Sequence, residues 1–468
     1  MLTTQAQPIF FEPSRNNLGT WSIADRQMQI DLVTEDRPID IVAEGFGDGM
    51  FSLYPQLLAA VWTSVSMNTV KKIMSEMIAR VDKPHHASLN RRGRRLLLAS
   101  MLWLCACAVN PVRGSPLTPS GAAPVRHVFL IVLENEPYIT TFGEHSPAPY
   151  LAGELTKQGA LLPQYFGIGH YSLDNYIAMI SGQAPNSGTQ GDCNVYSEFL
   201  RSAPGLDANG QALGVGCIYP ADVKTVAEQI DGAALDWKAY MEDMGLDPSR
   251  ESASCGHVTI GAVDHTNYAT AHDQYADKHD PFVYFHSIID DPVRCAQHVV
   301  TLDRLVQDLK QIPATPNFAF ITPNLCHDGH DAPCKNGEPG GLISADGFLR
   351  VWVPRILASP AFRQDGLLII TFDEGTDALA CCDEQGLTGR PAPGQFGPGG
   401  GRIGAVLLSP FIAPGTTSAT PYNHYSLLRT VEDFFGLPHL GYAGAPRLQS
   451  FGTDVFTALP TQARRVVQ

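Results

Sequence analysis

The sequence is short of basic residues. Its 468 residues include 32 Lys and Arg against 47 Asp and Glu, which gives a formal charge of −15 at pH 7. Proteins that coat nucleic acid cluster Lys and Arg along the phosphate backbone, so this balance argues against a nucleic-acid partner. Phosphate chemistry as such is not excluded, because a bound metal ion supplies positive charge locally.

Long hydrophobic runs are also missing. The segment "RRGRRLLLASMLWLCACAVNPVRG", residues 91–114, places four arginines before an apolar run of roughly a dozen residues, too short for an ordinary membrane span. It predicts a signal peptide with cleavage after Ala108, or a lipid anchor at Cys107; the alternative is a buried helix of a cytosolic domain. We therefore expect a secreted or periplasmic protein, with membrane contact only through this N-terminal segment.

The position of this segment is unusual, because about ninety residues precede it. Residues 1–90 show no sustained motif, and a start at Met74 or Met77 would restore ordinary signal architecture. We interpret residues 1–90 as an extension that an over-long reading frame would explain; the alternative is a cytoplasmic segment of an anchored protein. A linker, "SPLTPSGAAP" at 115–124, then leads into one predicted domain over 125–468.

Paired CxxC motifs, the usual sign of structural zinc, are absent from the sequence. Ten cysteines are present, and eight remain if Cys105 and Cys107 belong to the signal. An even set in an exported protein favours disulfides. Candidate pairs are Cys326 with Cys334 and Cys255 with Cys295. For the adjacent Cys381 and Cys382, a mutual bridge would be strained, so we expect their partners elsewhere.

Short apolar runs alternate with helical patterns along the predicted domain. The runs include "HVFLIVL", "NFAFITPN", "GLLIITF" and "GAVLLSPFI", and helical patterns include "DGFLRVWVPRILAS" and "YSLLRTVEDFFGL". This alternation predicts an α/β domain with a largely parallel central sheet. The sequence shows no internal repeat, and residues 186–216 and 378–402 read as loops.

Three apolar runs are followed by side chains of the types that bind metals in proteins. Glu134 and Asn135 follow the first, "LCHDGHD" (residues 325–331) follows the second, and Asp373 and Glu374 follow the third. One acidic residue after a strand is usually a turn or cap residue. Three such ends on parallel strands would gather carboxylates at one edge, where their repulsion requires a cation. We predict one or two divalent metal ions; oxygen ligands suit calcium, magnesium or manganese, and imidazole suits zinc.

The segment "GIGHYSLDNYIAMISGQAPN", residues 167–186, suggests a nucleophile. Glycine-rich chain precedes Ser172, and "LDNYIAMISG" predicts a helix that ends at Gly182. A serine at a helix start is most often a simple cap. The free N–H groups of a helix N-terminus also bind phosphate, and a metal beside the hydroxyl would let it attack phosphorus.

Six ordered motifs resemble one family. "LIVLENEPY", "YFGIGHYSLDNYIAMISG", "KHDPFVYFHSI", "FITPNLCHDGHD", "IITFDEG" and "YNHYSLLRTVEDFFGL" are similar to motifs of the bacterial phosphoesterase family of secreted acid phosphatases and phospholipases C. That family belongs to the alkaline phosphatase-like superfamily, so the resemblance, over about residues 126–440, implies a three-layer α/β sandwich with a mostly parallel sheet.

The resemblance also implies roles for single residues. The implied metal-site residues are Glu134, Asn135, Ser172, Asp328, His330, Asp373, Glu374 and His424. For His424 the alternative role is that of an acid that protonates the leaving group. Ser172 would form a phosphoserine intermediate, and Asn175 would donate to a phosphoryl oxygen. Lys278 and His279 match a basic pair that binds the phosphate or protonates the departing alcohol.

The sequence departs from the family pattern at a few positions. Tyr171 and Asp174 stand where prolines are common, and His327 stands where an Asn is expected. Asp174 suits an early helical turn but adds negative charge near an anionic substrate.

From these observations we predict an exported, metal-dependent phosphoric ester hydrolase. Small phosphomonoesters, phosphoinositides included, are the expected substrates. The first alternative is a phospholipase C that cleaves a phospholipid diester, against which weighs the lack of a basic amphipathic helix. The second is a non-catalytic metal-binding surface protein, which would have no need of Ser172 and Asn175.

Overall fold

The computed structural model of the chain describes residues 10–13, 19–23, 26–30, 124–383 and 397–458. They belong to two units, Met1–Val112 and Arg113–Gln468. In the first unit the described residues form an antiparallel sheet of β1 (Phe10–Pro13), β2 (Gly19–Ile23) and β3 (Arg26–Ile30). The predicted signal or anchor at 91–114 and the linker at 115–123 lie outside the described residues.

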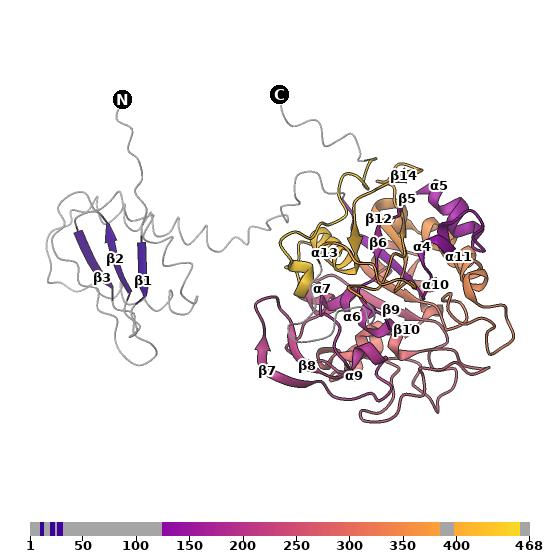
Figure 1. Cartoon of the computed structure of the whole chain (residues 1–468), viewed down its shortest axis with the longest axis horizontal. Coiled ribbons are helices and arrows are strands. Elements are labelled where there is room, and N and C mark those ends of the chain that lie inside the picture. Colours follow the sequence, from indigo (N-terminus) through magenta and orange to yellow (C-terminus); the bar gives the residue numbers. More distant parts are fainter. Residues whose placement is uncertain (1–9, 14–18, 24–25, 31–123, 384–396, 459–468) are drawn as a thin grey trace, which may run out of the picture. The chain divides into compact units, whose positions relative to one another are not determined.

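The second unit is built on an eight-stranded sheet with the strand order β10-β9-β11-β4-β12-β13-β5-β14 (Figure 1). In chain order its strands are β4 (His127–Leu133), β5 (Ala160–Leu162), β9 (Trp237–Met241), β10 (Val299–Thr301), β11 (Phe318–Thr322), β12 (Gly366–Phe372), β13 (Ala405–Leu408) and β14 (Thr416–Thr417). Neighbouring strands pair in parallel except at β13, which is antiparallel to both β12 and β5. The predicted α/β class with a mostly parallel central sheet is confirmed.

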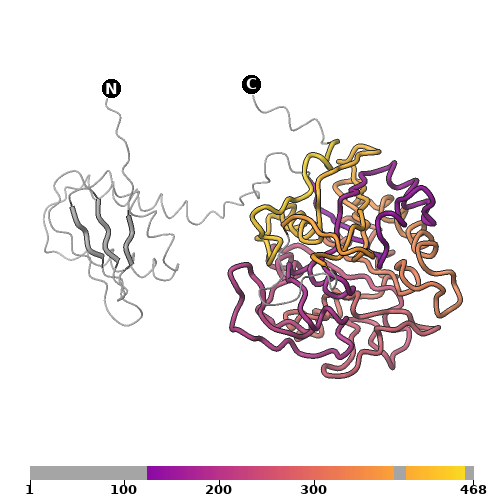
Figure 2. The backbone as a smooth tube through the Cα atoms, viewed as in Figure 1, coloured from indigo at the N-terminus to yellow at the C-terminus, as the bar shows by residue number. Residues whose placement is uncertain are grey.

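The three central strands are wholly buried. Every residue of β4, β11 and β12 is buried, and their sequences are continuous apolar runs without polar alternation. Such strands occur where helices cover both faces of a sheet. These strands are far apart in the sequence, yet β4 pairs with β11 on one side and with β12 on the other. Figure 2 traces the backbone that contains them, coloured by residue number.

Helices lie on both sides of this sheet, which gives the predicted three layers (Figure 1). The α-helices are α4 (Tyr138–Phe142), α5 (Thr156–Gln158), α6 (Ser172–Ser181), α7 (Val226–Gly232), α8 (His286–Ile289), α9 (Pro292–His298), α10 (Leu305–Asp308), α11 (Gly341–Ala358), α12 (Pro360–Asp365) and α13 (His424–Phe435). A π-helical turn, η2 (Tyr150–Leu155), precedes α5, and short 3-10 turns include η3 (Thr189–Gly191), η4 (Asp277–His279) and η5 (Pro281–Tyr284). None of the helices among the described residues combines the length and apolar character needed to span a membrane.

Helix α6 begins and ends within one residue of the bounds that the sequence predicts. Ser172 is its first residue, and Gly182 follows the last residue with φ 67°, the left-handed conformation that glycine adopts most readily. The Gly182 N–H donates to the carbonyl of Ala178 at 3.1 Å. Its backbone also touches the Leu440 segment so closely that a Cβ would lie 2.3 Å from the Leu440 oxygen.

Residues 186–216, predicted as a loop, contain regular structure. They include η3 and a β-hairpin formed by β7 (Leu200–Leu206) and β8 (Ala212–Val215). No residue of β7 is buried, so the strand has no apolar run that a sequence pattern could detect. The loop prediction for this segment was therefore wrong over the hairpin.

Four disulfides are present among the described residues. The predicted pairs Cys255–Cys295 and Cys326–Cys334 are confirmed, and Cys193 pairs with Cys217. Cys381 and Cys382 bond to each other, so the expectation of partners elsewhere was wrong. The physical reason is that the other six described cysteines satisfy one another, which leaves each of these two only its chain neighbour.

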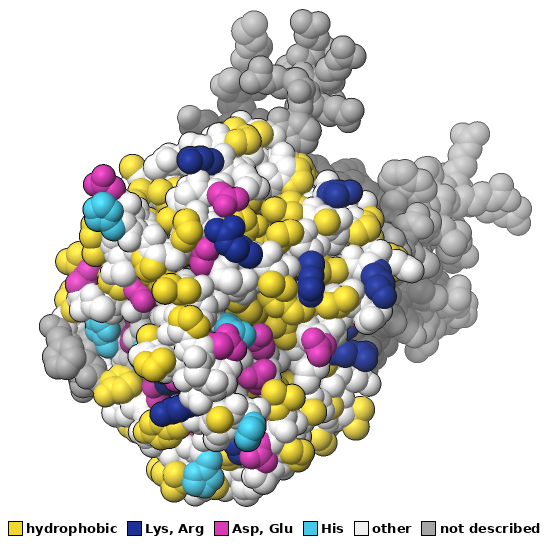
Figure 3. All heavy atoms as spheres, turned by 90° about the vertical axis from the view of Figure 1, so that its right-hand side faces the viewer, with side chains coloured by type: hydrophobic (Ala, Val, Ile, Leu, Met, Phe, Trp, Pro, Cys, Tyr) yellow, Lys and Arg dark blue, Asp and Glu magenta, His cyan; other side chains and the backbone are white. Residues whose placement is uncertain are grey.

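The surface view in Figure 3 shows how charge is distributed on one face of the molecule. Lys and Arg side chains on this face lie singly or in small groups between acidic and hydrophobic side chains, and they do not form one continuous basic surface. The arrangement agrees with the acidic balance of the whole sequence.

Gly182→Ala tests the close packing at the end of α6. We expect it to lower the free energy of unfolding by about 2–4 kcal/mol, because a methyl group here combines left-handed backbone with a backbone clash. Gly347→Ala on α11 is the control, since a methyl there meets nothing within 4 Å; it should raise stability by up to about 1 kcal/mol. Urea denaturation measures both, and equal stabilities of the two variants would contradict the prediction.

Glu432→Gln tests a buried carboxyl on α13. Burial raises the pKa of Glu432 to about 9, and its Oε1 accepts the Leu440 N–H at 2.8 Å. In the unfolded chain a Glu titrates near pH 4.3, so wild-type stability should fall as the pH rises from about 4.3 towards 9. The variant stays neutral, so its stability relative to wild type should increase from pH 5 to pH 8. Glu154→Gln, at an exposed position, should show no such trend.

Candidate active site

The central carboxylates meet at one edge of the sheet. Strands β11, β4 and β12 are neighbours and parallel, so the residues that follow them lie at the same edge. Glu134, Asp328 and Asp373 are each at most 1% exposed. The Asn135 N–H donates to Asp373 Oδ1 at 2.9 Å, and the Glu134 N–H donates to the Asp328 carbonyl at 2.8 Å. The structure thus brings together residues that the sequence separates by up to 239 positions.

Ser172 joins this edge from the start of α6. Its Oγ donates a 2.7 Å hydrogen bond to Glu134 Oε2, and the Asn135 amide donates to the same oxygen at 2.8 Å. Ser172 is 2% exposed, although the preceding Tyr171 is 39% exposed. The hydroxyl therefore lies just beneath the surface, in direct contact with the carboxylate cluster.

Glycine backbone fixes the approach to Ser172. A Cβ on Gly167 would lie 2.7 Å from the Asp373 carbonyl oxygen, and one on Gly400 would lie 2.3 Å from the Gly169 oxygen. Two backbone hydrogen bonds, Gly167 N–H to the Gly401 carbonyl at 2.9 Å and Gly400 N–H to the Gly167 carbonyl at 3.1 Å, join the two segments. The "GPGGG" stretch thus packs its backbone against the chain that leads into α6.

Asn175 braces the same turn. Its Oδ1 accepts the N–H groups of Ile168 at 2.7 Å and Gly169 at 3.1 Å, and its Nδ2 donates to the carbonyls of Gly169 and Tyr171. Both amide hydrogens are therefore engaged within the chain. The role as donor to a phosphoryl oxygen stays a prediction, and it requires one of these bonds to be exchanged.

His424 lies behind Asp373. Its Nε2 is 2.6 Å from the Asp373 carbonyl oxygen and its Nδ1 is 3.1 Å from the Tyr165 hydroxyl. Because a carbonyl only accepts, Nε2 carries the hydrogen and Nδ1 accepts from Tyr165. Burial lowers the pKa of His424 to about 4, so the ring is neutral. In this arrangement the imidazole holds the backbone of Asp373, and its role as metal ligand or acid stays a prediction.

Lys278 and His279 enter from η4. His279 is 1% exposed and stacks on Tyr176 with ring centres 5.1 Å apart, while its Nε2 lies 3.2 Å from Glu134 Oε1. Burial and the Lys278 charge lower the pKa of His279 well below its usual value. Burial alone would also lower the pKa of Lys278, but the carboxylates of Asp192 and Glu134 outweigh it and raise that pKa. The site therefore contains a firmly cationic lysine and a neutral histidine.

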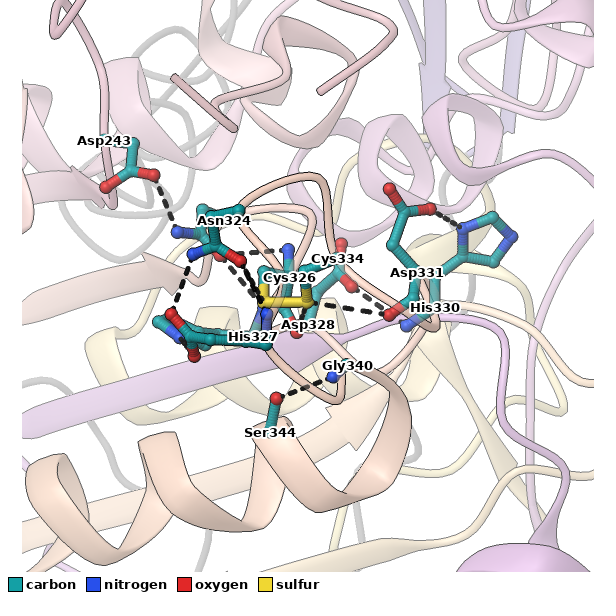
Figure 4. Close-up of a disulfide and its surroundings, with 12 residues drawn as sticks. Asp243, Asn324, Cys326, His327, Asp328, His330, Asp331, Cys334, Gly340 and Ser344 are labelled. Carbon is teal, nitrogen blue, oxygen red and sulfur yellow. Dashed lines mark hydrogen bonds and ion pairs between the residues drawn. A yellow bond between two sulfur atoms is a disulfide. The ribbon is translucent and has the colours of Figure 1, made fainter. Parts of the chain in front are cut away.

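His330 stands apart from the other predicted ligands. Its backbone N–H donates to Asp328 Oδ1 at 2.9 Å, but its ring pairs with Asp331 at 3.0 Å and the side chain is 53% exposed (Figure 4). The hydrogen bond to Asp331 raises the pKa of His330 to about 9. His327 points elsewhere, with Nδ1 3.0 Å from Glu242 and Nε2 3.2 Å from Glu338.

The electrostatics of the cluster favour a cation. Burial raises the pKa of Glu134, Asp328 and Asp373 well above the usual range of carboxyl groups, and mutual repulsion adds to it. Burial also raises the pKa of Glu374 to about 7, against the effect of His170. Four buried oxygens accept no hydrogen bond: Glu134 Oε1, Asp328 Oδ2, Asp373 Oδ2 and Glu374 Oε2. Such a set of carboxylate oxygens without hydrogen bonds fits a hard divalent cation.

A second group of ligand-type residues lies beside the first. It consists of Cys326, His327 and Glu338, whose possible ligand atoms all lie within 4.8 Å of one another. Among the described residues, no other group of three or more His, Cys, Asp or Glu side chains meets this distance. The Cys326 sulfur is bonded to Cys334, as Figure 4 shows, so it is not a thiolate. This group is therefore not a metal centre.

Sequence reasoning missed three residues of the site. His170 pairs with Glu374 at 3.5 Å, Tyr176 stacks on His279, and Asp192 pairs with Lys278 at 2.9 Å. His170 and Tyr176 fall within the segment already singled out around Ser172, so their proximity could have been noticed. Asp192 lies in a predicted loop with no motif, and no local signal marks it.

Known proteins with similar sequences are phosphatases by name. The chain is 29% identical over 291 residues to a phosphate-repressible acid phosphatase of Penicillium chrysogenum, which covers 62% of this chain and 55% of that protein. It is 24% identical over 322 residues to a probable acid phosphatase of Kluyveromyces lactis, with 60% of that protein covered. The chain thus spans little more than half the length of these two relatives. A phosphatidylinositol-3-phosphatase of Mycobacterium tuberculosis is 25% identical over 363 residues, 77% of this chain and 92% of that protein.

Solved structures resemble the chain only partly. A protein of the alkaline phosphatase superfamily from Vibrio parahaemolyticus covers 72% of this chain and 75% of its own length, with 12% identity and a TM-score of 0.36. A phosphonate monoester hydrolase from Silicibacter pomeroyi covers 72% and 78%, with 10% identity and a TM-score of 0.39.

The family itself is decided by the sequence match. The model of the phosphoesterase family matches residues 145–438, which include Ser172, Lys278, Asp373 and His424 and extend over more than half of the 468 residues. The chain belongs to the phosphoesterase family.

Proposed function

We propose that the protein is an exported, metal-dependent phosphomonoesterase that acts through a phosphoserine intermediate at Ser172. The observation that carries the proposal is the 2.7 Å hydrogen bond from Ser172 Oγ to Glu134 Oε2, made at the first residue of α6 beside a cluster of buried carboxylates. A plain cap would instead bond an N–H of its own helix, and α6 has no side-chain cap.

The chemistry runs in two displacements. Ser172 Oγ attacks the ester phosphorus, the bond from phosphorus to the alcohol oxygen breaks, and the departing oxygen takes up a proton. The Ser172 hydroxyl proton has an acceptor in place at Glu134. Water then attacks phosphorus, the bond to Oγ breaks, a proton from the water restores the Ser172 hydroxyl, and inorganic phosphate leaves. In-line geometry and fixed charge account for most of the catalysis in such reactions.

The metal would be held by the carboxylates at the sheet edge. Glu134, Asp328, Asp373 and Glu374 contribute the oxygens that accept no hydrogen bond, with Asn135, Ser172, His330 and His424 as the further predicted ligands. A divalent ion, one or two in number, supplies Lewis-acid stabilisation of the charge that develops on the oxygens around phosphorus. The fold of the chain holds these oxygens in buried positions close to one another.

The phosphate and the leaving group would be bound by the basic pair. Lys278 is cationic and 2.9 Å from Asp192, close to the start of α6, so its ammonium can pair with a phosphoryl oxygen. His279 is neutral and buried, so it would act through hydrogen bonds, and we propose it as the group nearest to the departing oxygen.

Relatives support the substrate class. The named acid phosphatases favour small phosphomonoesters, and the mycobacterial relative favours phosphoinositides as one group of them. The four disulfides favour an oxidising compartment and hence export.

Ser172→Ala tests the nucleophile. With p-nitrophenyl phosphate and divalent metal supplied, we expect kcat to fall by at least about 10³-fold, because the attacking oxygen is gone. Ser181→Ala is the matched control at the other end of the same helix. Its Oγ donates to the Ile177 carbonyl at 2.7 Å and accepts the Gln183 N–H at 3.3 Å, and the activity of the variant should stay near wild type. Full activity in Ser172→Ala, or turnover of phosphocholine esters alone, would contradict the proposal.

Asp373→Asn tests the metal. Removing one of the buried carboxylates should weaken metal binding by at least about tenfold, measured as metal retained after gel filtration or by calorimetry with zinc and manganese. Asp365→Asn is the control, because Asp365 lies at the opposite edge of the sheet, where it pairs with His127. Equal metal content in both variants and wild type would refute this assignment.

A further inference from the structure

Asp192 holds the two groups that a phosphoryl oxygen would bind. Its Oδ1 accepts the backbone N–H of Leu173 at 3.1 Å, and its Oδ2 pairs with Lys278 Nζ at 2.9 Å. Leu173 directly follows the proposed nucleophile, so its N–H is one of the donors at the start of α6 that have no acceptor within the helix. The side chains of Asp192 and Lys278 are each 15% exposed, so the pair is largely shielded from solvent.

The position of Asp192 is fixed by its surroundings. It follows η3 with φ 48°, in the left-handed region, and its carbonyl accepts from Asn267 Nδ2 at 3.1 Å. The next residue, Cys193, is tied to Cys217 by a disulfide. The backbone of Asp192 is therefore held in place by contacts of its own, and these fix its carboxylate against the start of α6.

This geometry places the Asp192 carboxylate next to the proposed phosphate site. A phosphate group that pairs with Lys278 must lie close to Asp192, and repulsion between them grows with each charge the phosphate carries. The low exposure of both side chains limits screening by solvent and salt. A carboxylate here thus discriminates between a phosphate with one negative charge and a phosphate with two.

We propose that Asp192 is a specificity-determining residue that selects monoanionic phosphate esters. The inference rests on the proposed function and deepens it. A phosphomonoester has a second pKa of about 6, so it is mainly monoanionic below that pH and dianionic above it. A phosphodiester stays monoanionic throughout. Asp192 therefore restricts monoester cleavage to acidic pH while leaving diester binding nearly independent of pH.

Asp192→Asn is the test, because it removes the charge and keeps Oδ1 as acceptor for the Leu173 N–H. The measurement is kcat/KM from pH 5 to pH 8 with p-nitrophenyl phosphate and with its methyl diester, under saturating metal. We expect the variant to gain about tenfold or more on the monoester at pH 8, with a change of less than about threefold on the diester. If wild type does not turn over the diester, the monoester profile alone decides.

Other outcomes overturn the inference. A variant that loses activity on both esters in equal proportion at every pH would show that Asp192 only positions Lys278. A variant with the wild-type pH profile would show that its charge does not matter. Asp222→Asn, an exposed aspartate paired with Arg201, is the charge-matched control and should follow wild type.

Failure of the proposed function gives a different result. If wild type cleaves neither ester with metal supplied, or Ser172→Ala retains full turnover, the phosphomonoesterase proposal itself fails. If wild type acts through Ser172 and Asp192→Asn leaves the pH profile unchanged, only the assignment of Asp192 is wrong.

Discussion

Burying several carboxylates at one edge of a parallel sheet is the constraint on which the rest of the structure depends. Glu134, Asp328 and Asp373 are withdrawn from water, and each retains an oxygen without a hydrogen bond. Removing charge from water is costly unless an opposite charge or a proton compensates. Burial raises the pKa values of these carboxyl groups, which favours their protonated form, and the cationic Lys278 lies nearby. The proposed divalent metal would compensate the remaining negative charge.

The surrounding backbone is arranged to keep these groups in place. Gly167 and Gly400 let two chain segments pass at distances that no side chain would permit. Asn175 satisfies the N–H groups of the turn before Ser172, and His424 holds the carbonyl of Asp373. Asn175 and His424, which the sequence predicts to bind phosphate or metal directly, therefore also hold the backbone of the site in place. Such support matters because a hydroxyl must be positioned accurately to attack in line.

Charged side chains of both signs lie near Ser172. In the proposed mechanism Lys278 would attract the anionic ester, and Asp192 would limit the negative charge that the bound ester carries. Such a site would bind substrate more weakly and select it more sharply, because the carboxylate that pairs with Lys278 would compete with the substrate phosphate for it. The Asp174 side chain is buried against Gly169, so the acidic residue that the sequence places in the first turn of α6 contacts the turn before it.

Much of the framework was determined by the sequence alone. The continuous apolar runs of β4, β11 and β12 predicted buried parallel strands with acidic ends, and the glycine after α6 predicted where that helix ends. Each of these features is a local pattern of a few residues. The exposed hairpin β7–β8 left no such pattern and was missed.

Only the tertiary structure decided which side chains meet. The antiparallel course of β13, the turn of the His330 ring towards Asp331, the bond between Cys381 and Cys382, and the contact of Asp192 with Lys278 all depend on how distant segments pack. A sequence pattern reports what a residue's neighbours in the chain require. Contacts across the fold depend instead on the path of the whole chain, and that path is set by burial of the entire core.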